Sequence, residues 1–479
     1  MTTLVHAENI DTRVSRADVA GWEIHWPLFL LLVVGTAVLY VLPNALGRVI
    51  YPLMALHALR GPRQTVEAIA LMALALLGNP VVFPDGVKIF RWLVLFAGFG
   101  RVLWDTFIGD RALGAQTSVL QAVGAFALTT LVLAVTSGWM PGLSMFKLTV
   151  FCIGIVTLFV SFYRTLHLTH YWRSWFLTYF TAIAVLSMLI YPLGIGYLRT
   201  GQGYQGIMIH PQTLGPMAGV LMSCVAGYCV VRPDRSTQWL PVLGALGALV
   251  FLSGSRTGAV VLAGGAVLSF FVFAWRRDEV ALGPLLMKPA TFVAIFVLGT
   301  VLLLFPASLQ EPITAFIQKD AGEEATGVSE LYEDTRGELI EMSMNNFRAA
   351  PLVGIGFGIP SDPASLDPDA VGYERVEYVM GIPVSASYEK GFMPAAVLEE
   401  VGVLGALFLI MLLAAIAVPV IRYGSFPVVW TFLAAFLVNF SEAVLFSIGG
   451  LGLMIWMLFA FCHAQAVARR NRLWQGQRG

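Results

Sequence analysis

A few charged side chains stand at the ends of long apolar runs, where a charge is costly and is therefore a candidate for function. Arg256 lies in the very short turn LSGSRTGAVVL between two such runs, among the small residues Ser253, Gly254, Ser255 and Gly258. Small residues let backbones approach closely, and a guanidinium beside exposed N–H groups offers a planar set of donors that suits a phosphate. The alternative is an arginine that reaches the membrane surface and only defines the hairpin.

The segment YLRTGQGYQGIMIHPQTLGP contains a second cation before the start of an apolar run. Arg199 stands just outside the preceding run, and His210 with Pro211 opens the next one, with the proline near the first turn of the expected helix. A cation and a helix N-terminus that face one anion would form a binding site for it. Alternatively, Arg199 anchors the loop at the lipid headgroups and His210 only caps the helix.

Acidic residues gather in the segment SASYEKGFMPAAVLEEVGVLG. Glu389 and Lys390 lie just before an apolar run, and Glu399 and Glu400 lie within its first two turns. A carboxylate near a helix N-terminus is favoured by the helix dipole, and one that is screened from water can act as a general base. Solvation of the acids at the helix end is the alternative for Glu399 and Glu400.

The elements that must position these residues are membrane helices. The chain has 479 residues, of which 58% are hydrophobic and 12% charged, whereas soluble domains are about a quarter charged. This excludes a soluble globular enzyme and a disordered protein, and the equal numbers of basic and acidic residues, 29 each, exclude a nucleic-acid binder. About fourteen long apolar runs predict an all-α, polytopic membrane protein with about 12–14 transmembrane helices.

The placement of Lys and Arg predicts the orientation, because cytoplasmic segments carry the positive excess. One side holds 18 of the 29 basic residues and both termini, so both termini are expected in the cytoplasm. The other side receives one long segment, 307–393, with 15 of the 29 acidic residues. Within it, 329–348 has the pattern of an amphipathic helix that carries Arg336. A surface ion pair with Glu333 is the alternative to a functional role for Arg336.

Other familiar sites have no signature in the sequence. We find no Walker loop and no HExxH, CxxC or GxSxG motif, and all four cysteines lie inside apolar runs. We therefore expect no metal and no cofactor.

Four motifs, taken in order, resemble the O-antigen ligase and polymerase superfamily over roughly residues 190–420. They are HPQTLGPMAG, LSGSRTGAVVL, TRGELIEMSMNNFRAAPLVGIGFG and LEEVGVLGALFLIM. The family pattern is a small-residue turn with an arginine, a loop arginine before a proline that leads into GxGxG, and an ETG-like helix start. In this chain they match Arg256, Arg336, Pro351 with Gly354, Gly356 and Gly358, and Glu400-Val401-Gly402.

The resemblance implies a metal-independent membrane glycosyltransferase of lipopolysaccharide or exopolysaccharide biosynthesis. Its donor would be a glycan on undecaprenyl diphosphate at the periplasmic face of the bacterial inner membrane, and its acceptor lipid A core or another glycan. Arginines that match Arg199, Arg256 and Arg336 would hold the diphosphate, while apolar helices and membrane lipids surround the polyprenyl tail.

The chain departs from the family where a catalytic base is expected. Many members carry His-Asn shortly before the helix at 394–417, where this chain has Tyr388-Glu389-Lys390-Gly391. We expect Glu389 to act as the base, or Lys390 to add a phosphate contact, and His210 is a further catalytic candidate. A polymerase of the same superfamily, a transporter or flippase, and a non-catalytic component of a polysaccharide-assembly complex are the alternatives.

The expected organisation follows from these assignments. It comprises a cytoplasmic N-terminal tail at 1–25, about eleven transmembrane helices over 26–306, a periplasmic loop at 307–393, about three transmembrane helices over 394–467 and a basic cytoplasmic tail at 468–479.

Overall fold

The structure is a computed structural model that describes residues 23–476, with gaps at 42, 80–89, 110–116, 198–202, 233–235, 277–327, 363, 365–375, 380–381 and 387–389. The long elements in chain order are α2 Trp26–Val41, α3 Pro43–Ala58, α4 Pro62–Leu77, α5 Arg91–Phe107, α6 Thr117–Ser137, α7 Pro141–Arg164, α8 Thr169–Ile190, α9 Pro211–Val231, α10 Ser236–Leu252, α11 Arg256–Arg276, α15 Val328–Ala349, β1 Val376–Val379, β2 Ile382–Ala386, α16 Met393–Tyr423, α17 Phe426–Glu442 and α18 Gly450–Gly476. Two short 3-10 helices, η3 Leu166–Leu168 and η4 Tyr191–Leu193, flank α8.

The predicted fold class, a polytopic helical membrane protein, is confirmed. Among the described residues, seven helices are long and apolar enough to cross a membrane, and four shorter apolar helices accompany them. The amphipathic helix predicted at 329–348 is present as α15. The structure adds an antiparallel hairpin, formed by β1 and β2, to the segment between α15 and α16. The run expected to span at 290–306 lies outside the described residues.

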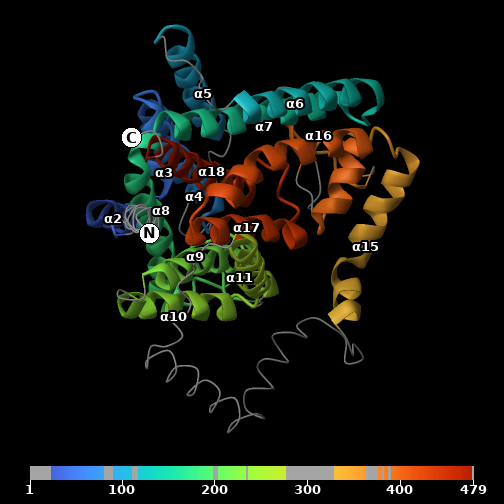
Figure 1. Ribbon diagram of the computed structural model, residues 1–479. Coiled ribbons are helices and arrows are strands. Elements are labelled where there is room, and N and C mark those ends of the chain that lie inside the picture. Colours follow the sequence, from blue (N-terminus) through green and yellow to red (C-terminus); the bar gives the residue numbers. More distant parts are fainter. Residues whose placement is uncertain are drawn as a thin grey trace, which may run out of the picture.

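Helix α18 lies at the centre of the bundle. Every residue in its most apolar window is buried inside the protein, and it packs against α16, α17, α7 and α4. Helix α17 packs in turn against α9 and α11, and α15 lies beside α16 at one edge of the molecule (Figure 1). Prolines in the first turns of α4, α7, α9, α16 and α17 help to set where these helices begin, because a proline lacks the N–H that the first turn leaves unpaired.

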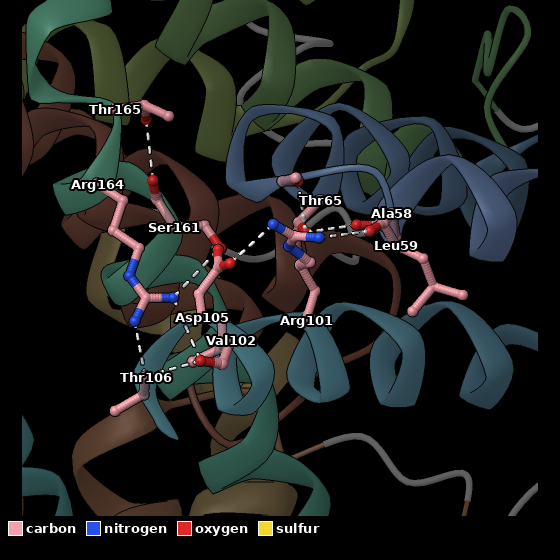
Figure 2. Close-up of polar contacts among 11 residues, drawn as sticks. Ala58, Leu59, Thr65, Arg101, Val102, Asp105, Thr106, Ser161, Arg164 and Thr165 are labelled. Carbon is pink, nitrogen blue, oxygen red and sulfur yellow. Dashed lines mark hydrogen bonds and ion pairs between the residues drawn. The ribbon is translucent and has the colours of Figure 1, made fainter. Parts of the chain in front are cut away.

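A polar cluster joins α5 to the C-terminal end of α7 (Figure 2). Asp105 accepts a hydrogen bond from Arg101 at 2.7 Å and forms an ion pair with Arg164 at 3.5 Å. Arg164 also donates to the Thr106 hydroxyl at 2.6 Å, and Arg101 donates to the Leu59 carbonyl at 3.2 Å. These contacts leave the buried carboxylate paired with two guanidinium groups, so the cluster fixes the helix ends.

Candidate functional site

Helices α9 and α11 carry two of the motifs, and they run side by side in the same direction. A Cβ at Gly215 would lie 2.3 Å from the Cβ of Ser255, and a Cβ at Gly219 would lie 2.4 Å from the Gly258 carbonyl oxygen. The residue numbers rise together along this contact, so the helices are parallel and their N-termini are neighbours. The small residues of the two motifs therefore permit direct backbone contact.

His210 and Arg256 are brought to this same end, which we call the site end. His210 caps α9, and its Nδ1 accepts a hydrogen bond from the Gln212 N–H at 3.2 Å. Arg256 is the first residue of α11 and is half-buried. The preceding loop is tied to the same place, because the N–H of Tyr204 donates to the Leu252 carbonyl at 3.0 Å. Burial raises the pKa of the Tyr204 phenol, so that group stays neutral.

The end of α17 adds a carboxylate to the site end. Thr257 follows Arg256, and its hydroxyl donates to Glu442 Oε1 at 3.5 Å while accepting from Ser441 Oγ at 2.8 Å. Ala443 then ends the helix with a φ of 34°, a left-handed conformation that is unusual for a residue other than glycine. The Glu442 carboxylate is thus held at the first turn of α11, where the helix dipole favours negative charge.

Helix α16 is broken at Gly402, whose φ of 59° and ψ of −172° are not helical. The N–H groups of Val403 and Leu404 donate to the carbonyls of Pro351 at 3.0 Å and Leu352 at 3.3 Å instead of to the preceding helical turn. A Cβ at Gly402 would lie 2.4 Å from the Leu352 carbonyl carbon. Glycine is therefore needed for the segment 351–358, which we call the glycine loop, to approach this closely.

The glycine loop also pairs the carbonyls on the other side of the break. The N–H of Ile355 donates to the Glu399 carbonyl at 2.8 Å, and that of Gly356 donates to the Glu400 carbonyl at 3.0 Å. Gly354 has a φ of 72°, and a Cβ there would lie 2.5 Å from the Glu400 carbonyl carbon. Two N–H groups and two carbonyls of α16 beside the break are thus paired with the glycine loop and keep a hydrogen-bond partner.

An aromatic side chain anchors the glycine loop in the bundle. Phe357 is fully buried, and its ring centroid lies 4.7 Å from that of Phe446, in the loop between α17 and α18, and 5.3 Å from that of Phe151 on α7. Phe392, just before α16, contacts Phe440 on α17 with ring centroids 6.1 Å apart. The glycine loop and the start of α16 are therefore packed against the same end of α17 that carries Glu442.

Lys390, Glu399 and Glu400 form a buried group that we call the carboxylate cluster. The Nζ of Lys390 lies 2.8 Å from Glu399 Oε2 and 3.3 Å from Glu400 Oε1, with the lysine side chain fully shielded from solvent. Solvation of the acids at a helix end is therefore wrong, because the two glutamates are 0% and 2% exposed. The role of Lys390 as a phosphate contact stays a prediction, although its ammonium faces two carboxylates.

The peptide of Gly358 lies beside the carboxylate cluster and is held from both sides. Its N–H donates to Glu400 Oε2, and its carbonyl accepts from Lys147 Nζ at 2.7 Å. Lys147 comes from α7, so this contact adds a hydrogen bond to the helix that Phe357 also contacts. Lys147 was not among the site residues predicted from the sequence. The run GIGFG was the one local signal that the backbone would be approached closely here.

Three of the predicted residues cannot be placed as side chains. Arg199 and Glu389 lie outside the described residues, and Arg336 lies on α15 in a part where the backbone alone is described. Within the described part of the chain, no group of three or more His, Cys, Asp or Glu side chains is arranged to hold a metal ion.

Comparison with known families bears on the motifs directly. Residues 241–381 match the family model of the O-antigen ligase, a range that includes Arg256, Arg336 and the glycine loop but ends before Lys390. No curated protein matches the chain. The resemblance predicted from the motifs is confirmed: the chain contains an O-antigen ligase family domain.

Proposed function

We propose that the protein is an O-antigen ligase-like glycosyltransferase, which moves a glycan from undecaprenyl diphosphate to lipid A core or another glycan at the periplasmic face of the inner membrane. The observation that carries this proposal is Arg256 in the first turn of α11, beside the parallel N-terminus of α9. The N-termini of α9 and α11 carry the positive ends of the two helix dipoles, and the Arg256 guanidinium belongs to the first turn of α11. This arrangement is suited to binding a diphosphate. The O-antigen ligase family domain supports the same chemistry.

The reaction breaks the bond between the sugar and the diphosphate, so negative charge develops on the departing diphosphate. Guanidinium groups that are held in place can stabilise this charge without a metal. In the proposal, Arg256 and Arg336 do so with Arg199, and the polyprenyl tail lies among apolar helices. The acceptor hydroxyl attacks the sugar and gives its proton to a base.

Two carboxylates are candidates for the base. Glu389 is the residue that the comparison with the family pattern favours, and it is followed directly by the anchored Lys390. Glu442 lies at the first turn of α11, next to the residue that follows Arg256. We expect Glu389→Gln to lower turnover at least tenfold, equivalent to about 1.4 kcal/mol in the barrier. Glu442→Gln is the comparison variant. If turnover falls in Glu442→Gln and not in Glu389→Gln, Glu442 is the base.

The arginine prediction tests the proposal as a whole. We expect Arg256→Ala and Arg336→Ala each to abolish glycan transfer by purified protein, and to abolish surface polysaccharide in cells, while the protein still inserts into the membrane. Arg348→Ala is the matched control, because Arg348 is exposed on the same helix as Arg336 and bonds only to a neighbouring asparagine among the contacts described here. Normal transfer by both variants would refute the diphosphate-binding role.

The acceptor distinguishes a ligase from a polymerase. A purified assay that offers lipid A core and lipid-linked glycan separately shows which one gains sugar. Accumulation of a lipid-linked substrate in proteoliposomes, with no glycan product, would instead indicate a transporter.

A further inference from the structure

Glu399 binds three segments that are far apart along the chain. Its Oε1 accepts from Asn346 Nδ2 on α15 at 2.7 Å, and its Oε2 accepts from Ser361 Oγ at 3.1 Å and from Lys390 Nζ at 2.8 Å. Asn346 also donates to the Ser361 carbonyl at 2.8 Å. A single buried carboxylate therefore joins the end of α15, the residues after the glycine loop and the residue that leads into α16.

Such a carboxylate is costly to bury, and the number of its partners indicates why it is tolerated. A buried charge is stable only when its ion pair and hydrogen bonds are complete. Glu399 has an ammonium, an amide and a hydroxyl as donors, and its neighbour Glu400 shares Lys390 and accepts from Gly358. Removing any one donor leaves the others in place but weakens the orientation of the group.

The contact through Asn346 determines how α15 lies against α16. Asn346 is close to the C-terminal end of α15, which extends along the edge of the molecule away from this anchor (Figure 1). Arg336 lies ten residues earlier on the same helix, about 15 Å along its axis. A tilt of α15 by about 4° at the anchor would move the backbone of Arg336 by about 1 Å. Misplacement of that size can lower a reaction rate about a hundredfold.

We propose that Glu399 and Asn346 are positioning residues for glycan transfer, because their hydrogen bond holds α15 at the angle that brings Arg336 to the donor diphosphate. This inference rests on the proposed function of Arg336. It gives the carboxylate cluster a role beyond packing. Among the described helices, α15 carries a predicted diphosphate ligand at the edge of the bundle, and the cluster attaches α15 to α16.

Two adjacent asparagines make a matched pair for the test. Asn346→Ala removes the hydrogen bond to Glu399, whereas Asn345→Ala changes an exposed side chain that accepts from Arg348. Glu399→Gln is the second variant, and it keeps the shape of the side chain. Amide hydrogen exchange on the purified protein, without substrate, reports the attachment of α15. We expect exchange over 337–349 to rise at least tenfold in the Asn346 and Glu399 variants and to stay unchanged in Asn345→Ala.

Turnover in a second background tests whether the effect passes through Arg336. We expect Asn346→Ala to lower turnover at least tenfold in the otherwise unchanged protein but less than twofold when Arg336→Lys is already present. If Asn346→Ala lowers turnover by the same factor in both backgrounds, and Arg336→Lys by itself also lowers turnover, the positioning role is wrong. The proposed function of Arg336 would then still stand. Unchanged hydrogen exchange in Asn346→Ala would also overturn it. Full turnover in Arg336→Ala, which removes the positive charge, would refute the proposed function of Arg336 and, with it, this inference.

Discussion

The break in α16 offers a sharp test of how the glycine loop is held. Gly402→Ala introduces a side chain at a φ of 59° and a ψ of −172°, a region that residues other than glycine avoid at a cost of about 1–3 kcal/mol. The new Cβ would lie 2.4 Å from the Leu352 carbonyl carbon, so the loop must withdraw. Withdrawal breaks the hydrogen bonds from Val403 and Leu404 to the loop, and each such hydrogen bond contributes about 0.5–1.5 kcal/mol.

The lower values of these terms add to about 2 kcal/mol, which corresponds to a change of about thirtyfold in the unfolding equilibrium. We expect Gly402→Ala to lower the free energy of unfolding by at least that amount, measured by reversible denaturation in mixed detergent micelles. Gly124→Ala on α6 is the control, because a Cβ there meets nothing within 4 Å. It is expected to be neutral or slightly stabilising, since alanine favours a helix.

Wild-type stability and turnover in Gly402→Ala would refute the reasoning. Such a result would mean that the break tolerates a side chain and that the contact with Leu352 is not a constraint on the loop. A loss in Gly124→Ala of similar size would mean that any added methyl group disturbs the bundle.

Two further predictions concern the carboxylate cluster and the contact between α9 and α11. Lys390→Met leaves two buried carboxylates without the Lys390 ammonium and should lower the stability of the protein by about 3–5 kcal/mol, measured by thermal denaturation. Glu400→Gln keeps one cation with one carboxylate and should lower the stability by less. Equal losses of stability in the two variants would contradict this ion-pair balance. Gly219→Ala places a Cβ 2.4 Å from the Gly258 carbonyl oxygen, so it should separate the two helices and lower both stability and glycan transfer. Gly244→Ala on α10, where a Cβ meets nothing within 4 Å, is the control, and similar effects in the two variants would argue against a specific helix contact.

Local patterns in the sequence were sufficient for the fold class and for several element boundaries. Hydropathy and proline placement depend on neighbouring residues, so the apolar helices and the amphipathic α15 could be predicted from short windows. The same holds for the start of α11 at Arg256, because a turn of small residues between two apolar runs marks a helix end. The order of the motifs was also enough to identify the O-antigen ligase family domain.

The partners of the charged residues were not available from the sequence. Glu399 and Lys390 are nine positions apart, but the Asn346 that completes their environment is 53 residues from Glu399, and the pairing of all three exists only after α15 folds back on α16. An isolated EE pair at a helix start is compatible with solvation, with catalysis and with a buried ion pair. The choice among these depends on desolvation by segments that are distant in the chain.

The sequence by itself determined that this protein is a helical membrane protein with an arginine at a glycine-rich helix start, because hydropathy and backbone preference act over a few residues. Only the tertiary structure decided that α9 and α11 run parallel, that Gly402 breaks α16 to receive the glycine loop, and that Lys390 faces two buried acids. These features depend on close approach and desolvation between segments separated by tens to hundreds of residues, and such contacts leave no periodic signal in a single sequence.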